Sequence, residues 1–294
     1  MSKRNNKSQL IINIFFMLVA LACILPFILL FMSSITDETE ILKHGYSFFP
    51  QKISMFAYEY LLTNINSILR AYGITILITV VGTAVGLLMM AMLAYPLSRT
   101  EFKHRNVITF YVVFTMLLNG GLVPTYILYT RYLHFKNTLW ALLIPYLLMR
   151  GFYVIIMRTF FKTTIPDSII ESVRIDGGGE WRIFFQIVLP LSYPVLATVG
   201  LFLGLGYWND WMNGLIFISE TKLYSIQVLL NRILLDIQYL SNNQLSGTYD
   251  TGVAVPQESI RMALAVIGIV PIFIAYPFFQ RFFVKGLTIG AVKG

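Results

Sequence analysis

The stretch SIIESVRIDGGGEWRIFFQIVLPLS, residues 168–192, places five charged side chains, three consecutive glycines and a proline inside a strongly apolar chain. Pro166 is well placed as the first residue of a short helix ending near Asp176. The glycines that follow can end this helix, because glycine adopts left-handed conformations. A second amphipathic helix is expected over residues 180–188. The stretch therefore predicts two helices joined by a tight turn, too polar for a bilayer core and too apolar to lie free in water.

The chain as a whole has the composition of a membrane protein. Of its 294 residues, 57% are apolar and only 12% are charged, and the mean hydropathy is +0.71. Soluble domains are about half apolar and a quarter charged. The single cysteine, Cys23, excludes an internal disulfide framework. Three histidines far apart in the sequence do not suggest a metal cluster.

Six apolar segments reach the length of about 20 residues that a membrane-crossing helix needs. They predict an all-α membrane protein, a single transmembrane domain over residues 1–294, with spans at about 10–33, 71–97, 107–130, 138–158, 191–218 and 260–283. The third span is expected to break, because it contains Asn119, Gly120, Gly121 and Pro124. Both a kink packed against a neighbour and a bend that lines a pathway fit this break.

The distribution of positive charge predicts the orientation. Thirteen of the 22 lysines and arginines lie on the cytoplasmic side if the N-terminus is inside, so both termini are expected in the cytoplasm of a bacterial cell. The loop of residues 159–190 and the tail of residues 284–294 are then cytoplasmic. Residues 34–70 and 219–259 are external, and QYLSNNQLSGTYDTG, residues 238–252, predicts an exposed loop. The net charge of +8 then reflects topology, and nucleic-acid binding is not indicated.

The cytoplasmic loop resembles the signature of the permease subunits of binding-protein-dependent ABC importers. That signature is Glu-Ala-Ala, three residues, Gly, nine residues, Ile, one residue and Leu-Pro. This chain has Glu171-Ser172-Val173, Gly177, Ile187 and Leu189-Pro190 at the same spacing, with Ser172-Val173 in place of the two alanines. The resemblance implies the type I importer permease fold, in which the first helix of the loop is a coupling helix seated on an ATPase subunit.

The resemblance also implies the residues that contact the ATPase. They are Glu171, Ser172, Val173, Asp176, Gly177, Ile187, Leu189 and Pro190. An apolar face of the first helix could be formed by Ile169, Ile170, Val173 and Ile175. Glu171 would pair with a basic residue of the partner as a charge-assisted hydrogen bond. An amphipathic helix lying on the lipid surface is the alternative to docking.

Further motifs are similar to the carbohydrate-importing class, especially the smaller maltose-importer permease. They are FFVKGLTIGAVKG (282–294), NGGLVPTY (119–126), AYPLSR (94–99) and YWNDWMN (207–213). In that class the tail inserts between the two ATPase subunits, which implies an interface of Lys285, Gly286, Thr288, Gly290, Lys293 and Gly294. A frayed terminus is the alternative.

Polar and aromatic residues near the spans are candidates for the solute pathway. Ionisable residues inside spans are costly and suggest function, and aromatic faces with amide and acid groups suit a saccharide. The candidates are Asn119, Tyr126, Arg150, Tyr153, Tyr207, Trp208, Asn209, Asp210, Trp211 and Asn213. Alternatively, the aromatic residues mark the membrane interface, and Arg150 and Asp210 pair with each other or with a second permease.

No Walker A pattern occurs, so the chain is expected to bind no cofactor and to have no ATPase site or catalytic residue. The resemblance implies a second homologous permease, two ATPase subunits that hold ATP and Mg²⁺, and an extracellular solute-binding protein. It also implies a carbohydrate as solute, of the oligosaccharide class. Two alternatives stay open, namely a non-sugar solute and a stand-alone secondary transporter. An intramembrane enzyme is disfavoured by the scattered histidines and lone cysteine.

Overall fold

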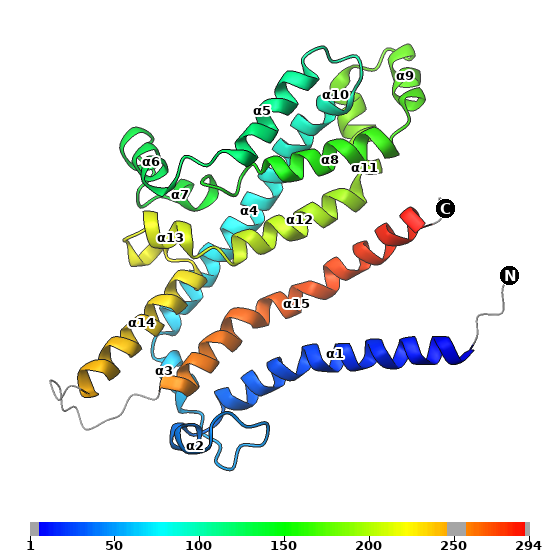
Figure 1. The fold of residues 1–294 in the computed structure, drawn as a ribbon. Helices are drawn as coiled ribbons and strands as arrows, with labels where there is room; N and C mark the ends of the chain where they lie inside the picture. The colour runs from blue at the N-terminus through cyan, green and yellow to red at the C-terminus, as the bar shows by residue number, and fades with distance from the viewer. Residues whose placement is uncertain (1–5, 246–256, 292–294) are drawn as a thin grey trace. The chain divides into compact units, whose positions relative to one another are not determined.

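The structure, a computed structural model, describes residues 6–245 and 257–291, with side chains described for residues 9–239 and 257–277. The described residues form helices, and their one antiparallel bridge joins Thr36 to Ile53 (Figure 1). This confirms the all-α prediction. The chain divides into two compact units, residues 1–66 with 230–272 (unit 1) and residues 67–229 with 273–294 (unit 2). The single transmembrane domain stays a prediction.

Unit 1 is built on long apolar helices and two short ones. Its elements are α1 (Asn6–Ser34), α2 (Glu38–His44), α3 (Phe56–Leu62) and parts of α14 (Ile226–Leu245) and α15 (Gln257–Ala291). The Glu38 carboxylate accepts hydrogen bonds from the backbone N–H groups of Glu258 and Ser259, both at 2.9 Å. A carboxylate there satisfies free N–H groups in the first turn of α15 and complements the helix dipole.

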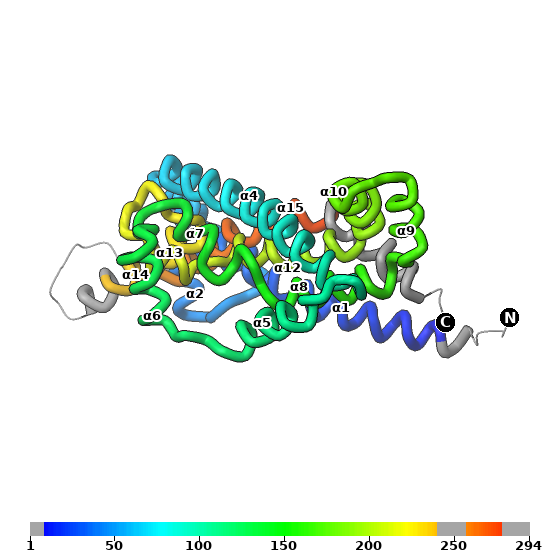
Figure 2. The backbone as a smooth tube through the Cα atoms, turned by 90° about the horizontal axis from the view of Figure 1, so that it is seen from above, coloured from blue at the N-terminus to red at the C-terminus, as the bar shows by residue number. Residues whose placement is uncertain are grey.

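Unit 2 carries the loop and the remaining helices. Its elements are α4 (Ile65–Ser98), which begins at the unit boundary, α5 (Arg105–Leu117), α6 (Leu122–Ile127), the π-helical η1 (Leu128–Tyr132), α7 (Trp140–Leu143), α8 (Gly151–Thr164), α9 (Asp167–Ile175), α10 (Glu180–Ile183), the π-helical η2 (Phe184–Val188), α11 (Leu189–Leu191), α12 (Tyr193–Trp208), α13 (Met212–Phe217) and the short 3₁₀ turn η3 (Thr221–Leu223). Within this unit, α9 and α10 lie at one end and α6, α7 and α13 at the other (Figures 1 and 2).

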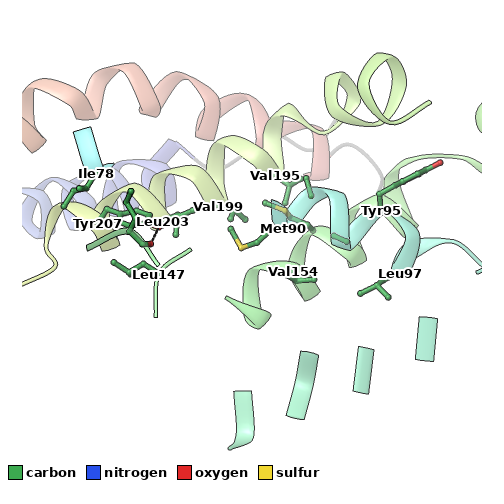
Figure 3. Close-up of a cluster of buried hydrophobic side chains, with 14 of the residues drawn as sticks. Ile78, Met90, Tyr95, Leu97, Leu147, Val154, Val195, Val199, Leu203 and Tyr207 are labelled. Atoms are coloured by element: carbon green, nitrogen blue, oxygen red, sulfur yellow. Dashed lines mark hydrogen bonds between the residues drawn. The ribbon is translucent and has the colours of Figure 1, made fainter. Parts of the chain in front are cut away.

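The core of unit 2 lies where α4, α8 and α12 meet. Figure 3 shows part of it: Ile78, Met90, Leu147, Val154, Val195, Val199, Leu203 and Tyr207, all buried. Small residues let the helices approach closely, as is common between membrane helices. A Cβ on Gly82 would lie 2.3 Å from the Tyr207 ring, and one on Gly86 would lie 2.8 Å from the Leu148 carbonyl oxygen. The fully buried Tyr207 hydroxyl donates to the Leu143 carbonyl at 2.7 Å.

Three helical segments are long and apolar enough to cross a membrane by themselves, Gln9–Ser34, Ile65–Ser98 and Gln257–Pro277. They coincide with the first, second and sixth predicted spans. Two further candidates are bent pairs of helices, Arg105–Leu117 with Leu122–Tyr132 at 112° and Glu180–Leu191 with Tyr193–Trp208 at 78°. The described residues therefore offer three spans, or up to five if each bent pair counts as one, and six are not confirmed.

The predicted break in the third span is confirmed. α5 ends at Leu117, and the chain turns through Gly121, whose φ of 83° is left-handed, before α6 begins. Pro124 lies in the first turn of α6, where a missing N–H breaks no helical hydrogen bond. The bend is larger than a kink.

Three sequence-based predictions are wrong in detail. The fourth segment, 138–158, is not one helix, because α7 ends at Leu143 and α8 begins at Gly151. The fifth, 191–218, contains α12 and α13 separated at residues 209–211. Residues 238–245 of the predicted external loop continue α14 as a helix, whereas residues 246–256 lie outside the described residues.

The contact between Gly82 and Tyr207 gives a stability prediction. Gly82→Ala would place a methyl group against a rigid buried ring, and overpacking of this kind costs about 1–3 kcal/mol. Gly73→Ala is the matched control on α4, because a Cβ there meets nothing within 4 Å. We expect thermal unfolding followed by fluorescence-detected size exclusion to show a lower midpoint for Gly82→Ala only. Equal midpoints for both variants would contradict this packing.

Candidate functional site

The first helix of the loop, α9, has charged residues that suit its ends. Pro166 is the N-cap residue, one position earlier than predicted, and α9 begins at Asp167. The X-Pro geometry favours an extended residue before the proline, so α8 ends at Thr164 and a new helix starts afterwards. Asp167 lies in the first turn and Arg174 in the last, and both charges complement the helix dipole.

The triple glycine ends α9 in a Schellman motif. Gly177 has a left-handed φ of 77°, its N–H donates to the Arg174 carbonyl at 3.0 Å, and the Gly178 N–H donates to the Val173 carbonyl at 2.8 Å. Both bonds satisfy carbonyls that would otherwise lack a helical partner. A Cβ on Gly178 would lie 2.6 Å from Val173 Cγ1, so glycine is required there for close approach. This confirms the predicted tight turn.

The apolar residues of α9 divide between two sides. Ile170 is 2% exposed and belongs to the core of unit 2, and Val173 packs against that core. Ile175 is 85% exposed, and Glu171 and Ser172 are exposed as well. The interpretation that all four apolar residues face a partner is therefore wrong for Ile170 and Val173. These two side chains hold α9 on its own chain and leave the Glu171, Ser172 and Ile175 side open.

A buried arginine attaches α9 to the end of α4. Arg99 directly follows α4 and is 4% exposed. One terminal nitrogen lies 2.7 Å from Asp167 Oδ1, and the other donates to the Phe161 carbonyl at 3.3 Å. The guanidinium carbon also lies 5.4 Å from the centre of the Tyr95 ring. These contacts compensate for burying the charge, which would otherwise be costly.

Arg174 makes a second attachment at the other end of α9. Its guanidinium lies 3.1 Å from Glu101 Oε2 and 2.9 Å from Glu180 Oε1. The Tyr95 hydroxyl donates to Glu180 Oε2 at 2.8 Å. The hydrogen bond to Glu180 raises the pKa of Arg174 above its usual value. Residues 95–101 thus contact α9 and α10 at both ends of the turn.

These attachments were not predicted from the sequence. The motif AYPLSR contains Tyr95 and Arg99, and the sequence assigns it only a family resemblance. The sequence does contain a signal for them. Arg99 and Glu101 directly follow a long apolar segment, and each of the two loop helices begins with an acidic residue, so complementary charges are available.

The second loop helix is longer than predicted and contains a π-helical turn. It runs through α10, η2 and α11, with Ile183, Phe184 and Val188 buried and Ile187 and Leu189 half-buried. Trp181 is 65% exposed and stacks on Phe185 with a centroid distance of 5.9 Å. Trp181, Phe184 and residues of the α4 end line a cavity of about 400 Å³ beside α9. An exposed aromatic pair therefore lies on the second loop helix, and its Trp181 lines the same cavity as Arg174 of α9.

The loop passes into α12 at Ser192, where the helix axis bends by 78°. Pro190 is exposed in α11, and Pro194 lies in the first turn of α12. The Ser192 side chain is fully buried, and its hydroxyl lacks a hydrogen-bond partner among the described residues. The bend lets an amphipathic surface helix continue into an apolar one.

The predicted tail interface falls on less well described residues. The helix α15 continues to Ala291, so the backbone at Lys285, Gly286, Thr288 and Gly290 is helical, while their side chains are not described. Lys293 and Gly294 lie outside the described residues. The role of the tail at an ATPase stays a prediction.

The solute-pathway candidates separate into structural and available residues. Tyr207 is fully buried, Trp208 is 9% exposed and Tyr153 packs against the core. Tyr126 stacks on Phe217 at 5.9 Å. Asn119 accepts a hydrogen bond from the Gly121 N–H at 3.0 Å in the turn before α6. These five residues have packing or turn roles in this chain.

The other five candidates meet in one cavity of about 380 Å³ at the end of unit 2 that carries α7 and α13. The predicted residues lining it are Arg150, Asn209, Asp210, Trp211 and Asn213. Tyr146 also lines it and was not predicted. Asn213 is 2% exposed and donates through Nδ2 to Asp210 Oδ2 at 2.8 Å and to the Pro145 carbonyl at 3.0 Å. Within the described part of the chain, no ion pair joins Arg150 to Asp210, so the predicted pairing of these two residues is not found.

Residues 91–289 match the family described as "Binding-protein-dependent transport system inner membrane component". The chain is 35% identical over 291 residues to the polygalacturonan/rhamnogalacturonan transport system permease protein YtcP of Bacillus subtilis (strain 168), covering 99% of this chain and 100% of that protein. It is 37% identical over 271 residues to Protein LplC of the same organism, covering 92% and 90%.

A solved structure is also similar. It is a crystal structure of a bacterial ABC transporter involved in the import of the acidic polysaccharide alginate. The matching chain is 27% identical, with a TM-score of 0.78, and the similarity covers 96% of this chain and 99% of that one. The type I permease fold expected from the sequence is supported by this similarity.

The turn after α9 gives a prediction about local stability. Gly178→Ala would bring a methyl group to 2.6 Å from Val173 Cγ1 and 2.9 Å from the Val173 carbonyl, so the Schellman bonds must open. Gly179→Ala is the matched control, because its φ is −75° and a Cβ there meets nothing within 4 Å. We expect hydrogen–deuterium exchange of residues 176–178 to accelerate at least tenfold in Gly178→Ala and to stay unchanged in Gly179→Ala. Unchanged exchange in both would show that the turn tolerates a side chain.

Proposed function

Because the chain belongs to the binding-protein-dependent transport system inner membrane component family and is a permease subunit of an ABC importer, we propose that α9 and the turn at Gly177 couple it to an ATPase subunit. The observation that carries this proposal is the division of α9 into an inner side bound to its own chain and an open side. The inner side uses Ile170 and Val173. The open side presents Glu171, Ser172 and Ile175.

The attachments of α9 suit force transmission. A docking helix that moved independently of the spans would not transmit motion, but α9 is held to the end of α4 by Arg99 and Arg174. The left-handed turn fixes the direction of the second helix, which continues through the bend at Ser192 into α12. Closure of the ATPase subunits would then displace α9, α4 and α12 together, a rigid-body route to alternating access.

The open side of α9 has the properties of a docking surface. Ile175 of α9 and Trp181 of the second loop helix offer exposed apolar area, and Glu171 of α9 offers an exposed carboxylate. Interfaces gain most of their affinity from a few apolar and aromatic anchors, and a charge pair at the edge fixes register. A lipid-surface helix is less favoured, because the apolar residues Ile170 and Val173 already pack on the chain itself and do not face a bilayer.

The proposed solute is a carbohydrate, specifically an oligosaccharide. Support comes from YtcP, named for polygalacturonan/rhamnogalacturonan transport, and from the importer named for alginate. The arrangement we propose includes a second homologous permease, two ATPase subunits that hold ATP and Mg²⁺, and an extracellular solute-binding protein. In this proposed assembly, the partner subunits hydrolyse ATP and this chain does not. Both termini of this chain are proposed to be cytoplasmic. A stand-alone secondary transporter is disfavoured by the family membership, whereas a non-sugar solute is the alternative for the same assembly.

Reconstitution tests this function. The purified importer, assembled from this chain, its partner permease and the ATPase subunits, is placed in vesicles with the solute-binding protein. We expect ATP-dependent uptake of a labelled oligosaccharide and none when a non-hydrolysable ATP analogue replaces ATP. Uptake driven by an ion gradient without ATPase subunits would contradict the proposal.

A charge on the open side of α9 should weaken docking. Ile175→Glu places a carboxylate where an apolar contact is expected, and a buried unpaired charge costs about 2–5 kcal/mol, or more than tenfold in affinity. The control, Leu133→Glu, adds the same charge at a leucine that is 45% exposed near η1, at the other end of unit 2.

The measurement is co-purification of the ATPase subunits together with solute-stimulated ATP hydrolysis. We expect both to fall at least tenfold for Ile175→Glu and to stay within twofold of wild type for Leu133→Glu. Full hydrolysis by the Ile175→Glu importer would place the ATPase elsewhere on the chain.

A further inference from the structure

Arg150 lines the cavity at the α7 and α13 end, and its one hydrogen bond among the described residues uses Nε and leaves both terminal nitrogens of the guanidinium available. It is the N-cap residue of α8, with an extended backbone, and its side chain is exposed. Nε donates to the Tyr146 carbonyl at 3.2 Å. Neither terminal nitrogen has a hydrogen-bond or ion-pair partner among the described side chains and backbone groups. A guanidinium fixed through Nε presents two parallel N–H donors, the geometry that matches a carboxylate.

The backbone that positions this guanidinium is strained. Tyr146 has a left-handed φ of 62°, which is unusual for a bulky residue. Such conformations persist only where the surroundings determine them, and they gather at ligand sites. Here the Pro145 carbonyl accepts a hydrogen bond from Asn213 at 3.0 Å and the Leu147 side chain is buried, so both neighbours of Tyr146 are fixed. The strained residue thus directs its carbonyl to Arg150.

The acid that lines the same cavity, Asp210, makes hydrogen bonds to Asn213. Asp210 accepts hydrogen bonds from the Asn213 backbone N–H at 3.2 Å and from Asn213 Nδ2 at 2.8 Å. Within the described residues, Asp210 makes no ion pair with Arg150. Asn213 is 2% exposed, so its Nδ2 group holds Asp210 from inside the protein.

The walls of the cavity suit a sugar ring. Trp211 and Tyr146 are 42% and 46% exposed and offer aromatic faces. The volume of about 380 Å³ lies within the range of small-molecule sites, which is about 300–1,000 Å³. Hydroxyl groups of a ring can donate to the Asp210 carboxylate, while a negative group on the same ring meets Arg150.

We propose that the solute carries carboxylate groups, as oligosaccharides of uronic acids do, and that Arg150 binds one of these carboxylates in this cavity. This inference rests on the proposed function and specifies its substrate class. Two relatives agree with an acidic solute, because polygalacturonan is a polymer of a uronic acid and alginate is named as an acidic polysaccharide. A carboxylate of the partner permease or a lipid phosphate would have the same chemistry, so the experiment includes an arm for each.

The test measures solute binding to the complete importer in neutral detergent without anionic lipid and without the solute-binding protein. Equilibrium dialysis compares labelled trigalacturonate with its neutral methyl ester on wild type, Arg150→Gln, Arg150→Lys and Arg131→Gln. Arg131 is the matched control, an exposed arginine on η1 outside the cavity. We expect Arg150→Gln to raise the dissociation constant of trigalacturonate at least tenfold and that of the ester less than twofold. Arg150→Lys should recover part of the loss, and Arg131→Gln should match wild type.

Several results would overturn the inference. They are the absence of trigalacturonate binding in wild type, equal binding of acid and ester, and unchanged binding in Arg150→Gln. Dissociation of the permease pair in Arg150→Gln, measured by size exclusion, would assign the arginine to the subunit interface. Loss of binding only when anionic lipid is added back would assign it to a headgroup. ATP-driven uptake of a neutral oligosaccharide by an otherwise active importer would contradict the acidic class while leaving the proposed function intact.

Discussion

The buried guanidinium of Arg99 joins the first turn of α9 to the end of α4, and the behaviour of the loop depends on this contact. A charge that is 4% exposed is tolerated only when it is paired and hydrogen-bonded. Asp167, the Phe161 carbonyl and the Tyr95 ring supply those partners at a place where three segments meet. Removing the guanidinium would leave α9 attached mainly through Ile170 and the more exposed Arg174 pairs, and exposed ion pairs contribute only about 0–1 kcal/mol.

The two ends of unit 2 have different physical characters. At the α9 end, the turn at Gly177 and the charge pairs of Arg99 and Arg174 hold the loop helices in place. The exposed side chains of Ile175 and Trp181 remain accessible to a partner. At the α7 and α13 end, a left-handed backbone at Tyr146 and an arginine with two unpaired terminal nitrogens among the described residues lie at a cavity. α4, α8 and α12 connect the two ends through a core packed around small residues. The proposed function needs this combination, because in it a movement received at the α9 end changes the cavity at the other end.

Features set by neighbouring residues were predictable from the sequence, and those set by tertiary contacts were not. The turn at Gly177 follows from local backbone preferences, and so does the break before α6. The roles of Arg99 and Arg174 depend on partners 68 and 73 residues away in the chain, and complementary charges in the sequence do not say which of these residues meet. Tyr207 is a solute-pathway candidate in the sequence, yet it lies in the core because Gly82 leaves room for its ring. Polar Ser and Asn residues in 238–245 suggested a loop, but they continue a helix whose buried positions include Ile237.

The central claim, that α9 moves with the end of α4 as one body, can be measured by electron paramagnetic resonance. Spin labels at Thr100 and Ser172, both exposed, flank the Arg99 and Arg174 attachments in a chain with Cys23 replaced by alanine. The distance distribution between the labels is recorded in the reconstituted importer without nucleotide and after trapping with ATP and vanadate. The account predicts the same narrow distribution in both states, while the distances from Ser172 to its counterpart on the partner permease shorten. A shift of several ångströms between Thr100 and Ser172, on the scale of one helical turn of about 5.4 Å, would show that α9 moves independently and would contradict the account.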